Sequence, residues 1–271
     1  MDLSQATTLR KLVDELRGIA KRAGDAVMEV YRGKIAVELK EDSSPLTAAD
    51  RASHGIIRDA LAALGSGLPL LSEESAAEEL EDRLSWQRYW LVDPLDGTKE
   101  FVKRNDEFTI NIALVDHNRA VLGIVLAPAL ELEYAGALGV GAWKRDRDGV
   151  AESIHPSAGY DGPTRVVGSR SHPSGALNTY LERLGPHEIK PMGSSLKICL
   201  VADGQADVYP RFGPTSEWDT AAAQAILESA GGSMIDLAGR TLRYNTKESL
   251  LNPHFLAIGD CNRDWLAAVP K

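Results

Sequence analysis

The turn-forming segment at residues 90–101, Trp-Leu-Val-Asp-Pro-Leu-Asp-Gly-Thr-Lys-Glu-Phe, constrains the fold more than any other part of the sequence. An apolar run enters it as a β-strand would, and Pro94 and Gly97 then force a turn. Asp93 and Asp96 lie three residues apart on that turn, where close packing would raise a carboxyl pKa. Mg²⁺ would remove the electrostatic repulsion between the two carboxylates, because it prefers carboxylate oxygens as ligands and completes its coordination shell with water and substrate phosphate. The segment therefore predicts a metal-dependent phosphate site.

Three further acidic residues lie at the edges of expected structural elements. Glu73 follows the apolar residues Leu70 and Leu71, Asp219 opens an alanine-rich helical pattern, and Asp50 lies near the start of another helical pattern. A two-metal phosphatase needs such a supply of carboxylates, because its ions, about 3.5–4 Å apart, share a bridging carboxylate and activate a water. These residues are candidates for the same site.

Each of the three acidic residues also has a purely structural explanation. Thr47-x-x-Asp50 and Ser216-x-x-Asp219 both match a helix capping box, in which the acid satisfies backbone N–H groups of the first turn. Glu73 begins an acidic run, and such runs are usually solvent-exposed surface. Taken alone, each is better explained in this way, so the metal hypothesis depends on all of them meeting at the acidic turn.

The composition excludes some classes of partner. The 271 residues are 44% hydrophobic and 25% charged, as in ordinary globular proteins, and the length suits one large domain or two packed domains. A net charge of −9 argues against a surface for nucleic acid or an anionic membrane. It does not exclude a small anionic substrate, because bound cations invert the local field.

Several features predict a cytoplasmic protein. Cys199 and Cys261 lie in apolar, helix-like contexts and are expected to be buried free thiols, which fits a reducing compartment. The first residues lack the basic and apolar regions of a signal peptide, and no apolar run has the length of a membrane span. Loose attachment to the inner face of a membrane stays open.

The first half of the chain predicts helices followed by a sheet. Apolar residues recur at helical spacing over residues 9–27 and 47–64. Residues 108–115 alternate with period two, and the strands that follow predict an antiparallel meander. Residues 145–163 are charged and without period, so we expect the domain junction there, between an α+β domain at 1–150 and an α/β domain at 160–271.

The second half alternates between strands and helices. The pattern predicts a final short helix after strands at 164–168, 187–191, 206–209 and 255–259 and helices at 174–184, 194–203 and 216–230. Helices, then a run of strands, then alternation indicates layered sheets between pairs of helices.

At the acidic turn and at Trp218-Asp219 the chain resembles the inositol monophosphatase superfamily of lithium-sensitive, Mg²⁺-dependent phosphatases. The likeness runs from Ser-Pro-Leu-Thr-Ala-Ala-Asp at 44–50 to Gly231-Gly232. It implies the fold of that family, a layered sandwich in which α and β layers alternate as α-β-α-β-α. Its metal-site pattern shows no departure in this chain.

Within the superfamily, the chain is most similar to the 3′(2′),5′-bisphosphate nucleotidases of the bacterial CysQ type. The motifs that carry this similarity are Lys99-Glu100-Phe101, Lys103-Arg104-Asn105, Ser169-Arg170-Ser171-His172 and the Lys197 that follows Gly193-Ser194-Ser195. Without the resemblance, Lys197 would be an ordinary exposed helix lysine and His172 an ordinary loop residue.

The resemblance implies a role for each matching residue. Glu73, Asp93 and the Leu95 carbonyl would hold one metal, and Asp93, Asp96 and Asp219 a second. Thr98 and Asp50 would position and deprotonate the attacking water beside Glu73. The substrate would contact the Gly97 and Thr98 amides at its scissile phosphate, and otherwise Lys99, Ser169, His172, Gly193, Ser194, Lys197 and Asp219. The C-terminal domain would thus supply Asp219 and the nucleotide-side contacts, and Lys197 the fixed positive charge for a second phosphate.

These roles lead to an expected reaction. The resemblance implies that two or three Mg²⁺ ions support removal of the 3′-phosphate from adenosine 3′,5′-bisphosphate, which gives AMP and clears a by-product of sulfate assimilation. An inositol-1-monophosphatase with the same metal site is the alternative enzyme. A non-catalytic protein that senses nucleotide or metal is the alternative from another class, although it would not need the water-activating pair. Whether the chain is a monomer or a homodimer stays open.

Overall fold

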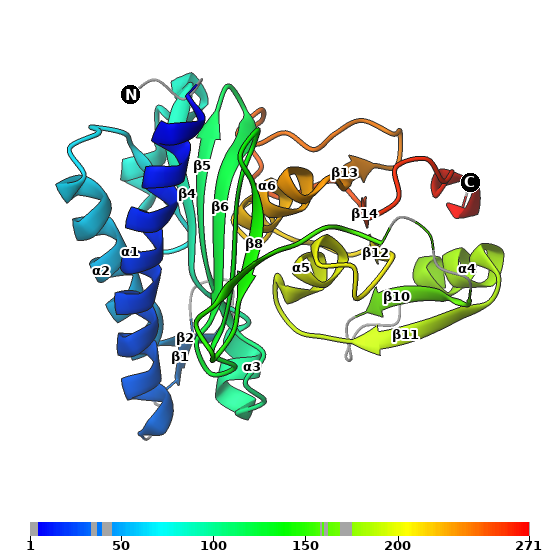
Figure 1. Ribbon diagram of the computed structural model, residues 1–271. Helices are drawn as coiled ribbons and strands as arrows, with labels where there is room; N and C mark the ends of the chain where they lie inside the picture. The colour runs from blue at the N-terminus through cyan, green and yellow to red at the C-terminus, as the bar shows by residue number, and fades with distance from the viewer. Residues whose placement is uncertain are drawn as a thin grey trace.

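Helices and β-sheets alternate in layers through the molecule (Figure 1). The computed structural model describes residues 5–33, 37–39, 45–157, 159, 162–168 and 175–270. The outer helices cover one face of a large sheet, a second pair of helices lies between the two sheets, and further helical segments cover the smaller sheet. The expected α-β-α-β-α sandwich is confirmed.

The large sheet has seven strands in the order β3-β4-β5-β6-β7-β8-β9. β3 runs parallel to β4, and every other neighbouring pair is antiparallel, so the predicted meander is confirmed. The strands are β3 (Leu70–Ser72), β4 (Arg88–Asp96), β5 (Thr109–Asp116), β6 (Arg119–Ala127), β7 (Leu132–Ala137), β8 (Gly141–Arg145) and β9 (Ala151–Ser153).

Two amphipathic helices, α1 (Ala6–Arg32) and α2 (Ala48–Ala63), cover one face of this sheet. Side chains alternate between the two faces of a strand. Along β5, Ile110 and Ile112 therefore join the core beneath these helices, and Ala113 joins the core on the opposite face. Both helices predicted from apolar spacing are confirmed.

The opposite face packs against α5 (Leu196–Ala202) and α6 (Ala221–Ala230), which lie between the sheets in Figure 1. Glycines in the sheet allow α6 to approach closely. A Cβ at Gly123 would lie 2.0 Å from the carbonyl oxygen of Ala222. A larger residue at Gly123 would force the helix away from the sheet. This close packing fixes the position of the turn that precedes α6.

The smaller sheet has the strand order β11-β10-β12-β14-β13. One face contributes to the core around α5 and α6, and the other packs against α4 (Gly175–Leu184) and the 3₁₀ helix η3 (Leu266–Ala268). Sequence patterning predicted all of these strands except β13. They are β10 (Thr164–Gly168), β11 (His187–Pro191), β12 (Val208–Arg211), β13 (Ser233–Asp236) and β14 (Phe255–Ile258).

Short elements complete the described structure. They are the antiparallel pair β1 (Val37–Leu39) and β2 (Pro45–Thr47), the 3₁₀ turns η1 (Ala77–Leu80) and η2 (Arg83–Ser85), and α3 (Thr98–Lys103). Among the described residues, none of the helices is both long enough and apolar enough to cross a membrane. The proposed domain junction at 145–163 stays a prediction.

Two local predictions are wrong. The helix expected from residue 216 begins at Ala221, because residues 216–220 form a turn instead of a first helical turn. Cys199 is buried as expected, but Cys261 is exposed, since it lies in a surface turn after β14 and not in a helix.

Candidate metal and substrate site

A β-bulge brings Asp93 and Asp96 together. Residues three apart on a regular strand point to opposite faces of the sheet. The pairing of β4 with β5 shifts register between these two residues, around Pro94, which has no N–H to donate. The irregularity turns both carboxylates to the same place, and the Leu95 N–H donates to Asp93 Oδ1 over 3.0 Å. Pro94 is therefore expected to favour the bulge that brings the two carboxylates together.

Asp219 completes a three-carboxylate cluster from the other end of the chain. Asp93, Asp96 and Asp219 each offer an oxygen, and these oxygens lie within 4.8 Å of one another. Asp219 lies in the turn before α6, where its Oδ2 accepts a hydrogen bond from the Ser216 N–H at 2.9 Å. The hydrogen bond from the Ser216 N–H is one of the two that define a capping box. It does not cap α6, because the helix begins only at Ala221.

Glu73 lies beside this cluster without belonging to it. β3 pairs in parallel with β4, with Ser72 opposite Val92. Glu73, which follows the last residue of β3, therefore lies next to Asp93. The Glu73 N–H donates to the Val92 carbonyl at 3.2 Å. Glu73 lines a cavity of about 290 Å³ together with the three clustered carboxylates, Leu95 and Thr98. All the predicted metal ligands therefore line one cavity.

Burial and mutual repulsion disfavour the charged form of this cluster. Burial, followed by the charges of Glu73, Asp96 and Asp219, raises the pKa of Asp93 well above its usual value. Burial, followed by the charge of Asp96, raises the pKa of Asp219 to about 8. A hard divalent cation would remove both penalties, and carboxylate and carbonyl oxygens are its preferred ligands. The residues therefore fit a metal site.

These raised pKa values predict how metal stabilisation depends on pH. Asp219 has a usual pKa of 3.8, and its value in the folded protein is about 8. Between these values the folded state binds more protons than the unfolded state, so its contribution to stability falls as pH rises. Metal binding requires the deprotonated ligands and strengthens over the same window. Mg²⁺ should therefore raise the unfolding temperature more at pH 8 than at pH 6, relative to EDTA. An equal increase at both values would contradict the proton competition.

Asp50 has the capping role considered from the sequence, and its position leaves the proposed catalytic role available. Its Oδ2 accepts hydrogen bonds at 2.7 Å from the backbone N–H and the hydroxyl of Thr47, which confirms the capping box at the start of α2. Its other oxygen lies 3.5 Å from the Thr98 hydroxyl, which is also 3.3 Å from the Leu95 carbonyl oxygen. The cap thus holds one carboxylate oxygen and leaves the other facing Thr98.

The backbone turns sharply between the cluster and α3. Gly97 has φ of 87°, a left-handed conformation that favours glycine, and a Cβ there would lie 2.3 Å from Ser194 Oγ. Lys99, on the first turn of α3, is exposed. It lines the cavity that holds the carboxylates and also a second, adjoining cavity, which is described below. Gly97 therefore permits a close approach between the two halves of the chain at the site.

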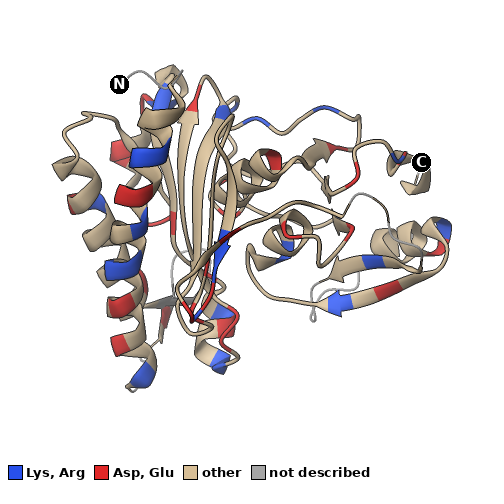
Figure 2. Cartoon of the chain, in the orientation of Figure 1, with Lys and Arg blue, Asp and Glu red and all other residues tan. Residues whose placement is uncertain are grey.

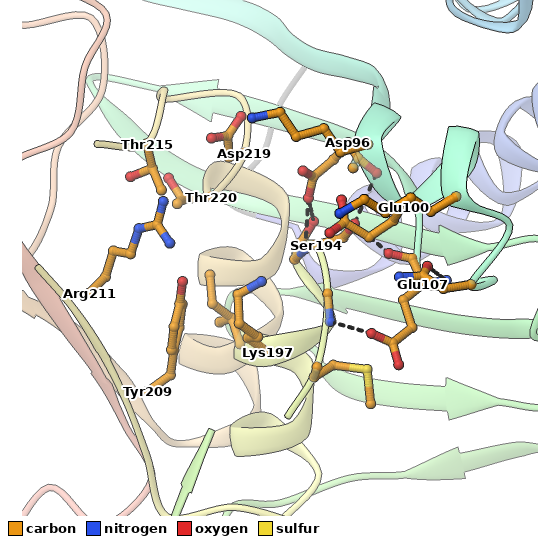
Figure 3. A pocket seen from close by; sticks show the side chains of 18 of the residues that line it. Asp96, Glu100, Glu107, Ser194, Lys197, Tyr209, Arg211, Thr215, Asp219 and Thr220 are labelled. Atoms are coloured by element: carbon orange, nitrogen blue, oxygen red, sulfur yellow. Dashed lines mark hydrogen bonds between the residues drawn. The ribbon is translucent and has the colours of Figure 1, made fainter. Parts of the chain in front are cut away.

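A second cavity of about 330 Å³ adjoins the first and shares Asp96 and Asp219 with it. Figure 3 shows Lys197, Tyr209 and Arg211 on one side of this cavity and Glu100, Glu107 and Ser194 on the other. Gly193 also lines it. The predicted residues of the nucleotide side that the structure describes are therefore gathered next to the carboxylates.

Lys197 is not an exposed helix lysine. Its side chain lies at the start of α5 and is only 8% exposed, and burial lowers its pKa to about 8. Its Nζ lies 5.6 Å from the centre of the Tyr209 ring, which is close enough for a cation–π interaction. A buried cation of this kind favours an anionic ligand, because an added negative charge would offset its desolvation.

Sequence patterning missed several residues of the site. Arg211, at the end of β12, donates to the carbonyl oxygens of Gly213 at 3.3 Å and Pro214 at 2.6 Å, and it lines the second cavity with Tyr209. Only the pairing of β12 within the small sheet brings these side chains to the site, so no local signal identifies them. The predicted substrate contacts Ser169 and His172 lie outside the described residues.

Comparison with known proteins identifies the relatives of this chain. A profile of the inositol monophosphatase family matches residues 8–264. The 3′(2′),5′-bisphosphate nucleotidase CysQ of Escherichia coli K12 is 50% identical over 246 residues, which cover 90% of this chain and 98% of that protein. A crystal structure of CysQ from Bacteroides thetaiotaomicron has 40% identity and a TM-score of 0.80 over 94% of this chain and 98% of its own. The IMPase of Thermotoga maritima has 25% identity and a TM-score of 0.76, with 95% of each chain covered.

Proposed function

Because the chain belongs to the inositol monophosphatase family, we propose that it is a metal-dependent 3′(2′),5′-bisphosphate nucleotidase. It removes the 3′-phosphate of adenosine 3′,5′-bisphosphate and gives AMP and phosphate. One observation carries the proposal: a cluster of three carboxylates, of which Asp93 is buried and the other two are half-buried, adjoins a cavity that holds a buried lysine and an arginine. Such a site suits a substrate with two phosphates, of which one reacts and the other is held.

Enzymes of this family are metal-dependent, and we propose that this one uses two or three Mg²⁺ ions. The residues that would hold them are Glu73, Asp93, Asp96, Asp219 and the Leu95 carbonyl. When bound, the cations neutralise charge on the transferred phosphoryl group and make water a better nucleophile at neutral pH. The positions of the clustered carboxylates determine where the Mg²⁺ ions bind.

The hydroxyl of Thr98 and the carboxylate of Asp50 orient the attacking water. Asp50 Oδ1 takes the proton that the water loses through the Thr98 hydroxyl, while its Oδ2 stays anchored at the start of α2. The water oxygen bonds to phosphorus, the bond from phosphorus to the 3′-oxygen breaks, and the ribose oxygen takes a proton from solvent, to which Asp50 returns the one that it accepted. The Gly97 and Thr98 amides and Lys99 contact the phosphate that is removed.

The second cavity holds the remainder of the nucleotide. We assign the 5′-phosphate to the positive charges of Lys197 and Arg211 and the nucleoside to the surrounding space, with Gly193 and Ser194 among its contacts. The two predicted contacts that are not described, Ser169 and His172, belong to the same proposal. A small monoester such as inositol 1-phosphate has no second phosphate for this cavity, so the cations of the cavity favour the bisphosphate.

The arrangement suggests a small soluble substrate as the partner. Figure 2 shows that lysine and arginine alternate with aspartate and glutamate along α1 and do not form a single basic face. Together with the net charge of −9, this opposes binding to nucleic acid. We propose that the enzyme acts on free nucleotide in the cytoplasm.

Paired assays test the substrate. The kcat/KM for adenosine 3′,5′-bisphosphate should exceed that for inositol 1-phosphate at saturating Mg²⁺. The reverse order would make the protein an inositol-1-monophosphatase. If a panel of phosphomonoesters released no phosphate with Mg²⁺, the residues would instead serve a non-catalytic binding protein.

A further inference from the structure

Asp96 is held in place by residues from the far side of the site. Its Oδ2 accepts two hydrogen bonds from Ser195, at 2.7 Å from the backbone N–H and at 2.8 Å from the hydroxyl. Ser194 Oγ lies 3.0 Å from the Asp96 carbonyl oxygen and 2.7 Å from the Glu107 carbonyl oxygen, and its single hydrogen is shared between these two acceptors. The residue just before α5 thus fixes the orientation of one of the three clustered carboxylates.

Behind Ser195 lies a buried polar group that takes no part in the proposed reaction. Asn111, on β5, is 1% exposed, and neither of the two cavities is lined by it. Its Oδ1 is placed 2.9 Å from Ser195 Oγ and 3.1 Å from Thr109 Oγ1, and these two hydroxyls lie 3.0 Å apart. Its Nδ2 is buried and has no hydrogen-bond partner in the described part of the chain.

Counting hydrogens indicates how this network is arranged. A serine hydroxyl has one hydrogen, and the charged carboxylate of Asp96 is the stronger acceptor for the hydrogen of Ser195. Ser195 Oγ then presents only lone pairs to Asn111. An amide oxygen would oppose these lone pairs, whereas an amide N–H would donate to them. Rotation of the amide group by half a turn removes the buried donor that lacks a partner.

With this rotation every hydrogen of the network has an acceptor. The two amide N–H groups of Asn111 donate to Ser195 Oγ and Thr109 Oγ1. Thr109 donates to Ser195, and Ser195 donates to Asp96. All of the hydrogen bonds therefore point toward the carboxylate, and such chains strengthen one another. The Asn111 oxygen takes the buried position in place of the nitrogen.

We propose that Asn111 is a positioning residue for the metal site that acts on Asp96 through Ser195, since the Ser195 hydroxyl lies 2.8 Å from Asp96 Oδ2 and the Thr109 hydroxyl only reaches 3.5 Å. The inference rests on the proposed function, since it assigns Asp96 to metal binding. Partners that orient metal ligands are worth about 10–100-fold in metal affinity or activity. Because Ser195 immediately precedes α5, the network also fixes the carboxylate relative to the helix that carries Lys197.

Metal binding by the folded protein without substrate tests the proposal. Asn111→Leu keeps the size of the side chain but removes both donors, so Mg²⁺ affinity measured by calorimetry should fall about tenfold. Ser195→Ala should also weaken binding, and the double variant should be no weaker than the weaker single variant, because Asn111 acts through Ser195. Ile112→Val is the matched control. Ile112 is the next residue on β5 and packs on the opposite face, so this change should lower the unfolding temperature without changing Mg²⁺ affinity.

An Asn111→Leu variant that folds and binds Mg²⁺ with an affinity within twofold of the wild type would overturn the proposal. The proposal would also be overturned if the loss of Mg²⁺ affinity in the double variant equalled the product of the two single losses.

If Asn111→Leu does not fold, a measurement on the wild-type protein tests the proposal instead. Nuclear Overhauser effects should connect the Asn111 side-chain N–H protons to the Ser195 β-protons, and their absence would refute the donor orientation. Mg²⁺-dependent phosphate release by the wild type tests the proposed function separately, so each can fail without the other.

Discussion

Asp93→Asn should abolish catalysis and at the same time stabilise the metal-free protein. Asp93 is proposed as the ligand shared by both metals, so phosphate release should fall about a thousandfold or more on every substrate. Burial and three neighbouring carboxylates disfavour its charge, as its raised pKa indicates. A neutral amide of the same shape removes that repulsion, so the unfolding temperature in EDTA should rise at pH 8.

The control for this variant is Asp59→Asn, which removes an exposed carboxylate of α2. It should change neither the rate of phosphate release nor the unfolding temperature appreciably. A metal-free Asp93→Asn protein less stable than the wild type would show that the Asp93 carboxylate stabilises the fold and is not kept for metal binding. Retention of more than about a tenth of the activity would remove it from the bridging role.

Lys197→Met should lower activity on the bisphosphate selectively. The side chain keeps its apolar stem and loses only the charge, which is buried beside the proposed 5′-phosphate site. Loss of one partner of a buried charge pair costs about 2–5 kcal/mol, which is at least about thirtyfold in kcat/KM. The kcat/KM for small monoesters, which have no second phosphate, should change about threefold or less.

Lys11→Met provides the matched control, because Lys11 is an exposed lysine of α1, which covers the face of the large sheet opposite to the one that packs against α5. It should leave the kcat/KM for both kinds of substrate unchanged. Equal losses on bisphosphate and monoester in Lys197→Met would exclude Lys197 from substrate selection. The comparison must use saturating Mg²⁺, since Lys197 also lies in the field of Asp96 and Asp219.

The part of the site that local patterning alone indicates lies within residues 93–98, whereas Glu73, Asp50 and Asp219 were candidates only if they met at the acidic turn, and Lys197 only through the resemblance. Asp93, Asp96, Gly97 and Thr98 follow one apolar strand, and the bulge that brings both carboxylates to one side is encoded locally by Pro94. The layered fold could be predicted because apolar spacing distinguishes the outer helices from the meander. The strand β13 was missed because it is short and comes directly after the Gly-Gly pair that ends α6.

The remainder of the site depends on contacts between distant segments. Asp219 matched a capping pattern, and only the packing of α6 against the sheet brings it within reach of Asp93. Arg211 and Asn111 lie on different sheets and carry no motif of their own. Their roles come from which side chains the two sheets bring together, and that information is not present in any local spacing.

The product of the reaction tests the central claim most directly. Adenosine 3′,5′-bisphosphate is incubated with the wild-type protein in Mg²⁺ or in EDTA, and the nucleotide formed is identified by chromatography against both adenosine monophosphates. The account predicts adenosine 5′-monophosphate and one equivalent of phosphate with Mg²⁺, and no turnover in EDTA. Formation of adenosine 3′-monophosphate, or the same rate in EDTA, would contradict it.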